Sequence, residues 1–315
     1  MLTAHQTGVS QRTRAIVARI TRFVERIRRG ALMSIQSVAV VGCGVMGAGI
    51  AQVVAAAGYR TIVCEQLDAP LQRGLARISD GYARSVKKGS MTAEQADVAY
   101  ARIVPTLDRQ ALAQADVVIE AIAEVAELKY ELFRALDSIC KPSTIFASNT
   151  SSIPIHLIAQ ATTRPDRVAG FHFFNPVPLM QLIELVSTPF TSADTQDALR
   201  QMGTALNKTV VAVKDESGFI VNRLLIPYLF EAVRLLDAGV ADRDAIDTAM
   251  KLGCGYPMGP LQLLDVIGLD TAVSIGDVLA RELADERLSA PQRLRSMVAN
   301  GQLGRKSGGG FYPLA

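Results

Sequence analysis

The chain has 315 residues, of which 49% are hydrophobic and 20% are charged. Its length suggests about two domains, and its composition is typical of a folded protein and excludes a disordered one. The net charge of +3 is uneven, because residues 1–32 contain seven arginines and one acid. The rest has 26 basic and 29 acidic side chains, a net charge of −3, which gives no basis for nucleic-acid binding.

The first 33 residues form an arginine-rich N-terminal extension. Residues 12–29 place apolar side chains at helical spacing, which predicts an amphipathic helix. Such a segment resembles a targeting peptide or a helix on a membrane surface. We favour an upstream start or extension instead, because a strand is predicted directly after Met33. We therefore expect a cytoplasmic protein.

Cysteine and histidine usage argues against a metal centre and a disulfide framework. The four cysteines lack metal-binding spacing, and the chain has only three histidines. This pattern fits a reducing compartment. Residues 38–59 are apolar enough to suggest a membrane span, with Gln52 their only strongly polar residue. Their five glycines argue against a span, and we expect none.

A strand, a glycine-rich turn and a helix open the main body. Ser37–Val41 suits a strand buried on both faces, and a helix is predicted to end at Ala57. In the G-x-G-x-x-G turn between them, the first glycine permits tight turning and the second lets the backbone approach a pyrophosphate. The third lets helix and strand pack closely. The pattern predicts dinucleotide binding by Gly42, Gly44, Val45, Met46 and Gly47.

Glu65 indicates which dinucleotide binds. It ends a predicted strand over residues 60–65, 18 residues after the last glycine of the turn, where an acid binds the ribose hydroxyls. Gln66 and Leu67 offer no cation for a 2′-phosphate, so NAD is favoured over NADP.

Helices and strands continue to residue 213, as a Rossmann-type doubly wound sheet requires. Helices are predicted at 68–88, 92–100, 127–140 and 192–206, and strands at 116–121, 144–147 and 209–213. Glu124 follows the first of these strands, at the edge where such sheets bind ligands. Lys129 is expected on a polar helix face. Lys87 and Lys88 either meet a phosphate or lie at a solvated helix end, which is our default. Residues 148–152 either cap the next helix through Ser151 or Ser152, our default, or bind a ligand.

Residues 168–186 contain two apolar strands joined by a turn, each strand with one ionisable residue. His172 lies on the first and Glu184 on the second. If the strands fold together, imidazole and carboxylate come within hydrogen-bonding reach, which holds a base in one tautomer. These residues alone are equally compatible with a buried structural histidine beside a carboxylate.

The pattern changes at Gly218, after which only helices are predicted, at 219–237, 242–252 and 261–283. We expect a separate all-α domain over residues 217–315, following the α/β domain over residues 34–216. Its apolar helices suit a homodimer interface. A glycine-rich tail over residues 304–312 is expected to be flexible.

Together these motifs resemble the 3-hydroxyacyl-CoA dehydrogenase family, especially the short single-function members often called 3-hydroxybutyryl-CoA dehydrogenases. Six segments carry the resemblance: G-C-G-V-M-G-A-G-I-A (42–51), S-N-T-S-S-I (148–153), G-F-H-F-F-N-P-V-P-L-M (170–180), G-F-I-V-N-R (218–223), G-Y-P-M-G-P (255–260) and G-R-K-S-G-G-G-F-Y (304–312). They span the chain except for its N-terminal extension.

The resemblance implies NAD-dependent interconversion of (S)-3-hydroxyacyl-CoA and 3-ketoacyl-CoA, as in β-oxidation of fatty acids. It implies that His172 is the catalytic base, with Glu184 as its partner, and that Ser151 and Asn222 contact the reacting oxygen. Further cofactor contacts are implied for Glu65, Glu124, Lys129, Asn149, Ser151, Asn175 and Lys306. Glu65 departs from the common aspartate but keeps the carboxylate.

Two other functions stay open. A related dehydrogenase of a free hydroxy acid, a sugar acid or carnitine would keep the same active-site motifs. A non-enzymatic NAD-binding protein would be expected to lose the catalytic set, yet Ser151, His172, Glu184 and Asn222 are all present.

Overall fold

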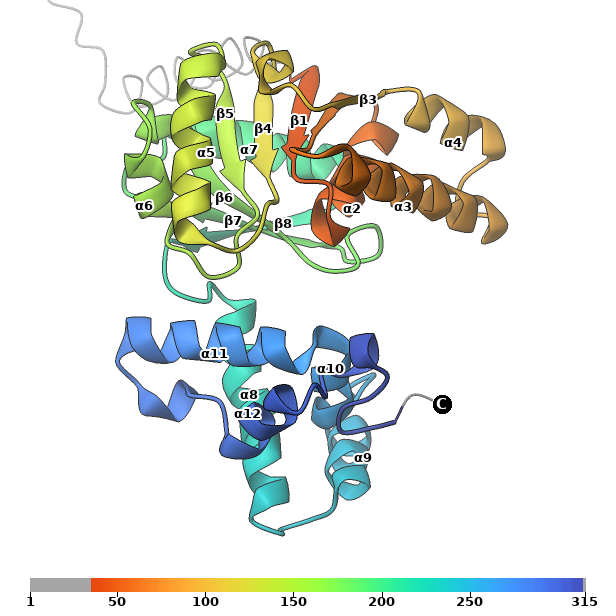
Figure 1. The fold of residues 1–315 in the computed structure, drawn as a ribbon, viewed down its shortest axis with the longest axis vertical. Helices are drawn as coiled ribbons and strands as arrows, with labels where there is room; N and C mark the ends of the chain where they lie inside the picture. The colour runs from red at the N-terminus through yellow and green to blue at the C-terminus, as the bar shows by residue number, and fades with distance from the viewer. Residues whose placement is uncertain (1–34, 314–315) are drawn as a thin grey trace, which may run out of the picture.

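The computed structural model describes residues 35–313, so the helix predicted within residues 12–29 lies outside the described residues. A sheet with flanking helices makes up one part of the chain, and helices α8–α12 make up the other (Figure 1). No helix within residues 35–313 is long and apolar enough to cross a membrane.

One sheet of eight strands forms the first part, in the order β3-β2-β1-β4-β5-β6-β7-β8. Neighbouring strands are parallel except β6 and β7, which are antiparallel. The direction of strand order reverses between β1 and β4, the place where doubly wound sheets bind dinucleotides. The predicted Rossmann-type fold is confirmed. The strands are β1 (Ser37–Val41), β2 (Arg60–Cys64), β3 (Ile103–Thr106), β4 (Val117–Glu120), β5 (Ile145–Ser148), β6 (Val168–Phe173), β7 (Leu182–Ser187) and β8 (Thr209–Lys214).

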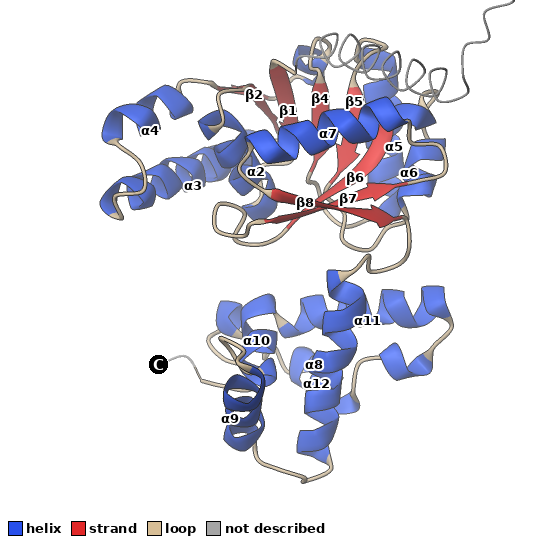
Figure 2. Cartoon of the chain, turned by 180° about the vertical axis from the view of Figure 1, so that it is seen from behind, coloured by secondary structure: helices blue, strands red, loops and turns tan. Residues whose placement is uncertain are grey.

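Helices cover both faces of the sheet, and its central strands are therefore buried on both sides. On one face, the apolar core contains side chains of α2 (Val45–Ala56), α3 (Asp68–Lys87), α4 (Ala93–Tyr100) and α7 (Ala193–Ala205). On the other face it contains side chains of α5 (Ala126–Ile139) and α6 (Ile155–Gln160). Figure 2 shows α7 crossing in front of the strands with α5 and α6 behind them.

Strand β3 was not predicted. It is a four-residue strand at the edge of the sheet, and Pro105 interrupts its apolar pattern. Proline is tolerated at a sheet edge because it cannot donate a ladder hydrogen bond, but it weakens the signal of a strand.

The helices after β8 enclose their own apolar core. They are α8 (Val221–Asp237), α9 (Arg243–Cys254), α10 (Pro260–Ile267), α11 (Leu269–Leu283) and α12 (Gln292–Ala299). The single helix predicted over residues 261–283 is wrong, because Gly268, with φ of +100°, divides it into α10 and α11.

The glycine-rich tail is anchored rather than free, which differs from its predicted flexibility. The Asp265 carboxylate on α10 accepts hydrogen bonds from the N–H groups of Phe311 (2.9 Å) and Tyr312 (2.8 Å). The Tyr312 hydroxyl donates to Asp247 Oδ2 at 2.9 Å, so two helices hold this segment.

Candidate active site

The glycine-rich turn has the close contacts that its sequence predicts. Gly42 has φ of +94°, and a Cβ atom there would lie 2.6 Å from the Ala121 carbonyl oxygen. At Gly47 a Cβ atom would lie 1.9 Å from the Gly42 carbonyl oxygen, so only glycine lets α2 pack so near β1. A Cβ atom at Gly44 would meet nothing within 4 Å. The turn therefore fits a bound pyrophosphate beside Gly44, at the start of α2, where backbone N–H groups and the helix dipole favour an anion.

Glu65 lies against this turn. Its Oε2 accepts a hydrogen bond from the Cys43 N–H at 2.9 Å, and its Oε1 accepts one from the Gln66 N–H at 2.9 Å. The carboxylate is thus held beside the turn, where the ribose of a dinucleotide would lie.

Burial raises the pKa of the Cys43 thiol to about 11, so this cysteine stays protonated and unreactive at neutral pH.

His172 and Glu184 form the pair that the two apolar strands suggested. They are direct partners in the antiparallel register of β6 and β7. Glu184 Oε2 lies 2.8 Å from His172 Nδ1, and both side chains are buried. The imidazole also packs against the rings of Phe174, with centroids 4.5 Å apart, and Phe219, at 5.6 Å.

The second oxygen of Glu184 reaches the helical part of the chain. Oε1 accepts hydrogen bonds from the N–H groups of Ile220 (3.0 Å) and Val221 (2.9 Å), where α8 begins. Asn222 follows directly, so the same carboxylate that orients His172 also places the backbone that carries Asn222. A carboxylate is suited to this place, because the first N–H groups of a helix have no partner within the helix and the helix dipole is positive there.

The serines after β5 do not cap the next helix, so the default interpretation of that segment is wrong. Helix α6 has no side-chain cap from within this segment. Its first N–H groups, on Ile155 and His156, donate instead to the Asp215 carboxylate at 2.9 and 2.7 Å. His156 Nδ1 also lies 2.7 Å from Asp215 Oδ2, so this histidine joins the cap of α6.

Glu124 accepts several hydrogen bonds from residues 148–152, which we call the serine loop. Its Oε1 accepts hydrogen bonds from Thr150 Oγ1 (2.5 Å), the Ser151 N–H (2.9 Å) and Ser152 Oγ (3.0 Å). Partial burial raises the pKa of Glu124, but the Lys129 ammonium and these hydrogen bonds outweigh it, so the pKa lies below its ordinary value. The carboxylate is therefore ionised at neutral pH and fixes the position of Ser151.

Lys129 is buried, and its predicted place on a polar helix face is wrong. Its ammonium lies 2.5 Å from Glu120 Oε1 and 3.1 Å from Glu124 Oε2. A helical pattern cannot reveal this, because both carboxylates come from the preceding strand and loop. Asn149 faces the next strand, where its Oδ1 accepts a hydrogen bond from the Phe173 N–H at 2.9 Å. This bond holds the serine loop beside the strand that carries His172.

Lys306 lies in the helical part, where its ammonium donates to Asp270 Oδ2 at 2.7 Å. Asn175 lies on the loop between β6 and β7 and lines a cleft between that loop and two helices. Hydrogen bonds thus bring His172, Glu184, Asn149 and the start of α8 together, whereas Lys306 is bonded within its own part of the chain.

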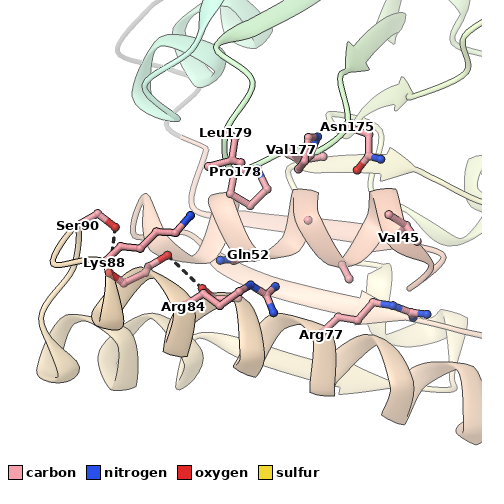
Figure 3. Close-up of a pocket in the computed structure, with 15 residues that line it drawn as sticks. Val45, Gln52, Arg77, Arg84, Lys88, Ser90, Asn175, Val177, Pro178 and Leu179 are labelled. Atoms are coloured by element: carbon pink, nitrogen blue, oxygen red, sulfur yellow. Dashed lines mark hydrogen bonds between the residues drawn. The ribbon is translucent and has the colours of Figure 1, made fainter. Parts of the chain in front are cut away.

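The cleft has a volume of about 360 Å³ and lies between α2, α3 and the loop over residues 175–179. Figure 3 shows the cationic side chains of α3 and its C-terminus on one side of the cleft, with Asn175 and Pro178 of the loop on the other. The cations are Arg77, Arg84 and Lys88. Lys88 is exposed at the C-terminal cap of α3, as predicted, and the spacing of 7 and 4 residues among the three cations puts them on one helix face.

Lys208 holds the loop that walls this cleft. Its buried ammonium donates to the carbonyl oxygens of Val177 (2.7 Å) and Met180 (2.6 Å). Burial lowers the pKa of Lys208, because these carbonyls replace water only in part. The loop that follows His172 is therefore tied to the turn before β8.

Two family models match the chain. The model for the 3-hydroxyacyl-CoA dehydrogenase NAD-binding domain matches residues 37–216, and that for the 3-hydroxyacyl-CoA dehydrogenase C-terminal domain matches residues 218–314. The chain belongs to the 3-hydroxyacyl-CoA dehydrogenase family. It is an NAD-dependent oxidoreductase, and the predicted family, enzyme class and cofactor are confirmed.

Known members of the 3-hydroxyacyl-CoA dehydrogenase family are similar over most of their length. The mitochondrial hydroxyacyl-coenzyme A dehydrogenase of Homo sapiens is 45% identical over 288 residues, 88% of this chain and 91% of that protein. The 3-hydroxybutyryl-CoA dehydrogenase of Mycobacterium tuberculosis is 44% identical over 281 residues, 89% and 98% of the two chains. The crystal structure of (S)-3-hydroxybutyryl-CoA dehydrogenase PaaH1 from Ralstonia eutropha superposes with a TM-score of 0.86 at 42% identity, covering 90% of this chain and all of that one.

The three glycines of the turn allow a matched test of the cofactor site. We expect Gly44→Ala to fold within about 0.5 kcal/mol of wild type, because its methyl group meets no protein atom. The same methyl group should lower NADH affinity at least about tenfold by blocking the pyrophosphate. Gly47→Ala should instead cost about 1–3 kcal/mol of stability through its clash with Gly42. Thermal unfolding and NADH fluorescence titration measure both, and unchanged NADH affinity in Gly44→Ala would contradict the site.

Proposed function

We propose that the enzyme interconverts (S)-3-hydroxyacyl-CoA and 3-ketoacyl-CoA, of the 3-hydroxybutyryl-CoA/acetoacetyl-CoA type, with His172 as the catalytic base. The observation that carries this proposal is the buried hydrogen bond between His172 Nδ1 and Glu184 Oε2. A buried imidazole beside a carboxylate, at the ligand-binding edge of a dinucleotide-binding sheet, is suited to acid–base catalysis. The names of the relatives support the substrate class.

The Glu184 contacts define which imidazole nitrogen acts. Nδ1 faces the Glu184 carboxylate, which can only accept a hydrogen bond when it is ionised, so in this mechanism Nδ1 carries the proton and Nε2 is free. Nε2 then removes the proton of the substrate's C3 hydroxyl group. Bound NAD supplies the acceptor for the C3 hydride. Glu184 stabilises the imidazolium that forms, and in the reverse direction His172 returns the proton to the C3 oxygen.

We assign the remaining residues of the site as follows. Ser151 and Asn222 orient the reacting C3 oxygen, where a displacement of about 1 Å is costly. Gly42, Gly44, Val45, Met46 and Gly47 hold the pyrophosphate, and Glu65 holds the ribose. Glu124, Lys129, Asn149, Ser151 and Asn175 surround the nicotinamide half, and Lys306 is a further cofactor contact from the helical part.

The cationic cleft favours a CoA thioester over a free hydroxy acid, a sugar acid or carnitine. Arg77, Arg84 and Lys88 place three cations along a cleft that begins at Asn175, near the end of the strand that carries His172. Cations suit the phosphates of a nucleotide carrier, and a free hydroxy acid has no group that reaches so far. A non-enzymatic role does not fit a member of the 3-hydroxyacyl-CoA dehydrogenase family that keeps Ser151, His172, Glu184 and Asn222.

We further propose that the protein acts as a homodimer in the cytoplasm, with the boundary between its two domains near residue 217. Large apolar side chains are exposed on α8, α9 and α10 and in the loop after α9, which supports association through the helical part. They are Leu224, Leu252, Tyr256 and Val266. The place in metabolism that fits the reaction is β-oxidation of fatty acids.

Replacing His172 tests the base directly. We expect His172→Ala to lower kcat with acetoacetyl-CoA by about 100-fold or more, because acid–base catalysis contributes at least that factor. NADH affinity should stay near wild type. His156→Ala is the matched control, since His156 also pairs with a carboxylate but lies at the start of α6, and its kcat should be unchanged. A His172→Ala enzyme with kcat within about threefold of wild type would remove His172 from the mechanism.

The substrate class is tested by comparing acetoacetyl-CoA with its N-acetylcysteamine thioester and with free acetoacetate. We expect NADH oxidation with both thioesters and little with the free acid. In the double variant Arg84→Ala/Lys88→Ala, the KM for acetoacetyl-CoA should rise roughly tenfold, which corresponds to the loss of about one charge-assisted hydrogen bond. The KM for the N-acetylcysteamine thioester, which lacks the nucleotide, should stay constant. Lys87→Ala, a neighbour outside the cleft, serves as control. Preference for the free acid in the wild-type enzyme would refute the CoA assignment.

A further inference from the structure

Glu120 is a fully buried carboxylate at the end of β4, outside every set of residues assigned above. Its Oε1 accepts hydrogen bonds from Lys129 Nζ (2.5 Å) and from the Ile122 N–H (2.8 Å). Its Oε2 accepts one from Ser148 Oγ at 2.6 Å. Three different segments thus converge on one carboxylate, namely the loop after β4, helix α5 and the end of β5.

The charges around Glu120 alternate. Lys129 is buried between the carboxylates of Glu120 and Glu124. A buried charge that loses its partner is strongly unfavourable, so the lysine must keep at least one of the two carboxylates close. While Glu120 holds Lys129 on one side, Glu124 needs only one oxygen for the lysine and keeps the other for the serine loop.

The serine loop is therefore held from both ends. Ser148, at its start, donates to Glu120 and accepts a hydrogen bond from the Thr150 N–H at 3.2 Å. The Asn149 N–H donates to the Glu120 carbonyl oxygen at 2.9 Å. At the other end, Glu124 accepts hydrogen bonds from Thr150, Ser151 and Ser152.

We propose that Glu120 is a positioning residue for Ser151. It neutralises Lys129 and anchors Ser148, and so it fixes the serine loop in the place from which the Ser151 hydroxyl meets the substrate. Without its charge, Lys129 draws Glu124 away from the loop and Ser151 moves. The inference rests on the proposed role of Ser151 in orienting the C3 oxygen.

A double-mutant cycle between Glu120→Gln and Ser151→Ala tests this dependence with acetoacetyl-CoA and NADH. Glutamine keeps the shape of the side chain but removes its charge. We expect Glu120→Gln to lower kcat at least about tenfold, as small misplacements at a reacting centre do. In the Ser151→Ala background the same change should alter kcat less than about twofold, because residues that act through each other are not additive. Effects that multiply would overturn the proposal.

Amide hydrogen exchange of the cofactor-free protein gives a second reading that needs no turnover. We expect the peptide over residues 149–153 to exchange faster in Glu120→Gln than in wild type. Asp137→Asn is the matched control, because Asp137 lies on α5, pairs with Arg164 at 2.5 Å and, within residues 35–313, makes no hydrogen bond to the serine loop. It should lower thermal stability but leave both kcat and this exchange unchanged. Unaltered exchange in Glu120→Gln would overturn the proposal.

Ser148→Ala covers the case in which Glu120→Gln does not fold. It removes the hydrogen bond from the loop to the Glu120 carboxylate and keeps the buried Glu120–Lys129 pair, and the same loss of kcat and faster exchange are expected. Wild-type kcat together with wild-type exchange in Ser148→Ala would also contradict the proposal. Ser151→Ala alone distinguishes failure of the proposed role of Ser151 from failure of the proposed role of Glu120. If Ser151→Ala keeps wild-type kcat, the role of Ser151 fails, while the exchange experiment still decides whether Glu120 holds the loop.

Discussion

The site depends on one carboxylate that serves two partners. One oxygen of Glu184 lies 2.8 Å from His172 Nδ1, and the other accepts hydrogen bonds from the first N–H groups of α8. The contact orients the imidazole ring, and the backbone hydrogen bonds satisfy two N–H groups that have no partner within the helix. The orientation of the His172 ring and the start of the helix that carries Asn222 are therefore set by the same side chain.

A second group of buried charges lies along the neighbouring strands. Glu120, Lys129 and Glu124 alternate in sign, and they fix the serine loop that follows β5. Asn149 joins this loop to β6 through Phe173. The carboxyl edge of the sheet thus holds two polar networks side by side, one around His172 and one around Ser151, and the parallel strands β5 and β6 bring them into register.

Much of this arrangement was predictable from the sequence, and the exceptions share a physical cause. The glycine turn, Glu65 and the His172–Glu184 pair were predicted because each depends on spacing within one strand–helix–strand unit or one hairpin. Lys129 was misplaced and Glu120 was missed, because their partners lie on different segments of the chain. The serines were assigned to a helix cap because Asp215, which takes that role, lies about sixty residues later in the sequence.

Replacing Glu184 by glutamine tests the shared carboxylate most directly. The amide oxygen of the new side chain can still accept from α8, but its NH₂ group then faces His172 Nδ1 and favours the tautomer that carries its proton on Nε2. We expect Glu184→Gln to lower kcat with acetoacetyl-CoA by about 100-fold or more, because the free base is lost. NADH affinity should stay near wild type. Wild-type kcat in this variant would contradict the role assigned to Glu184.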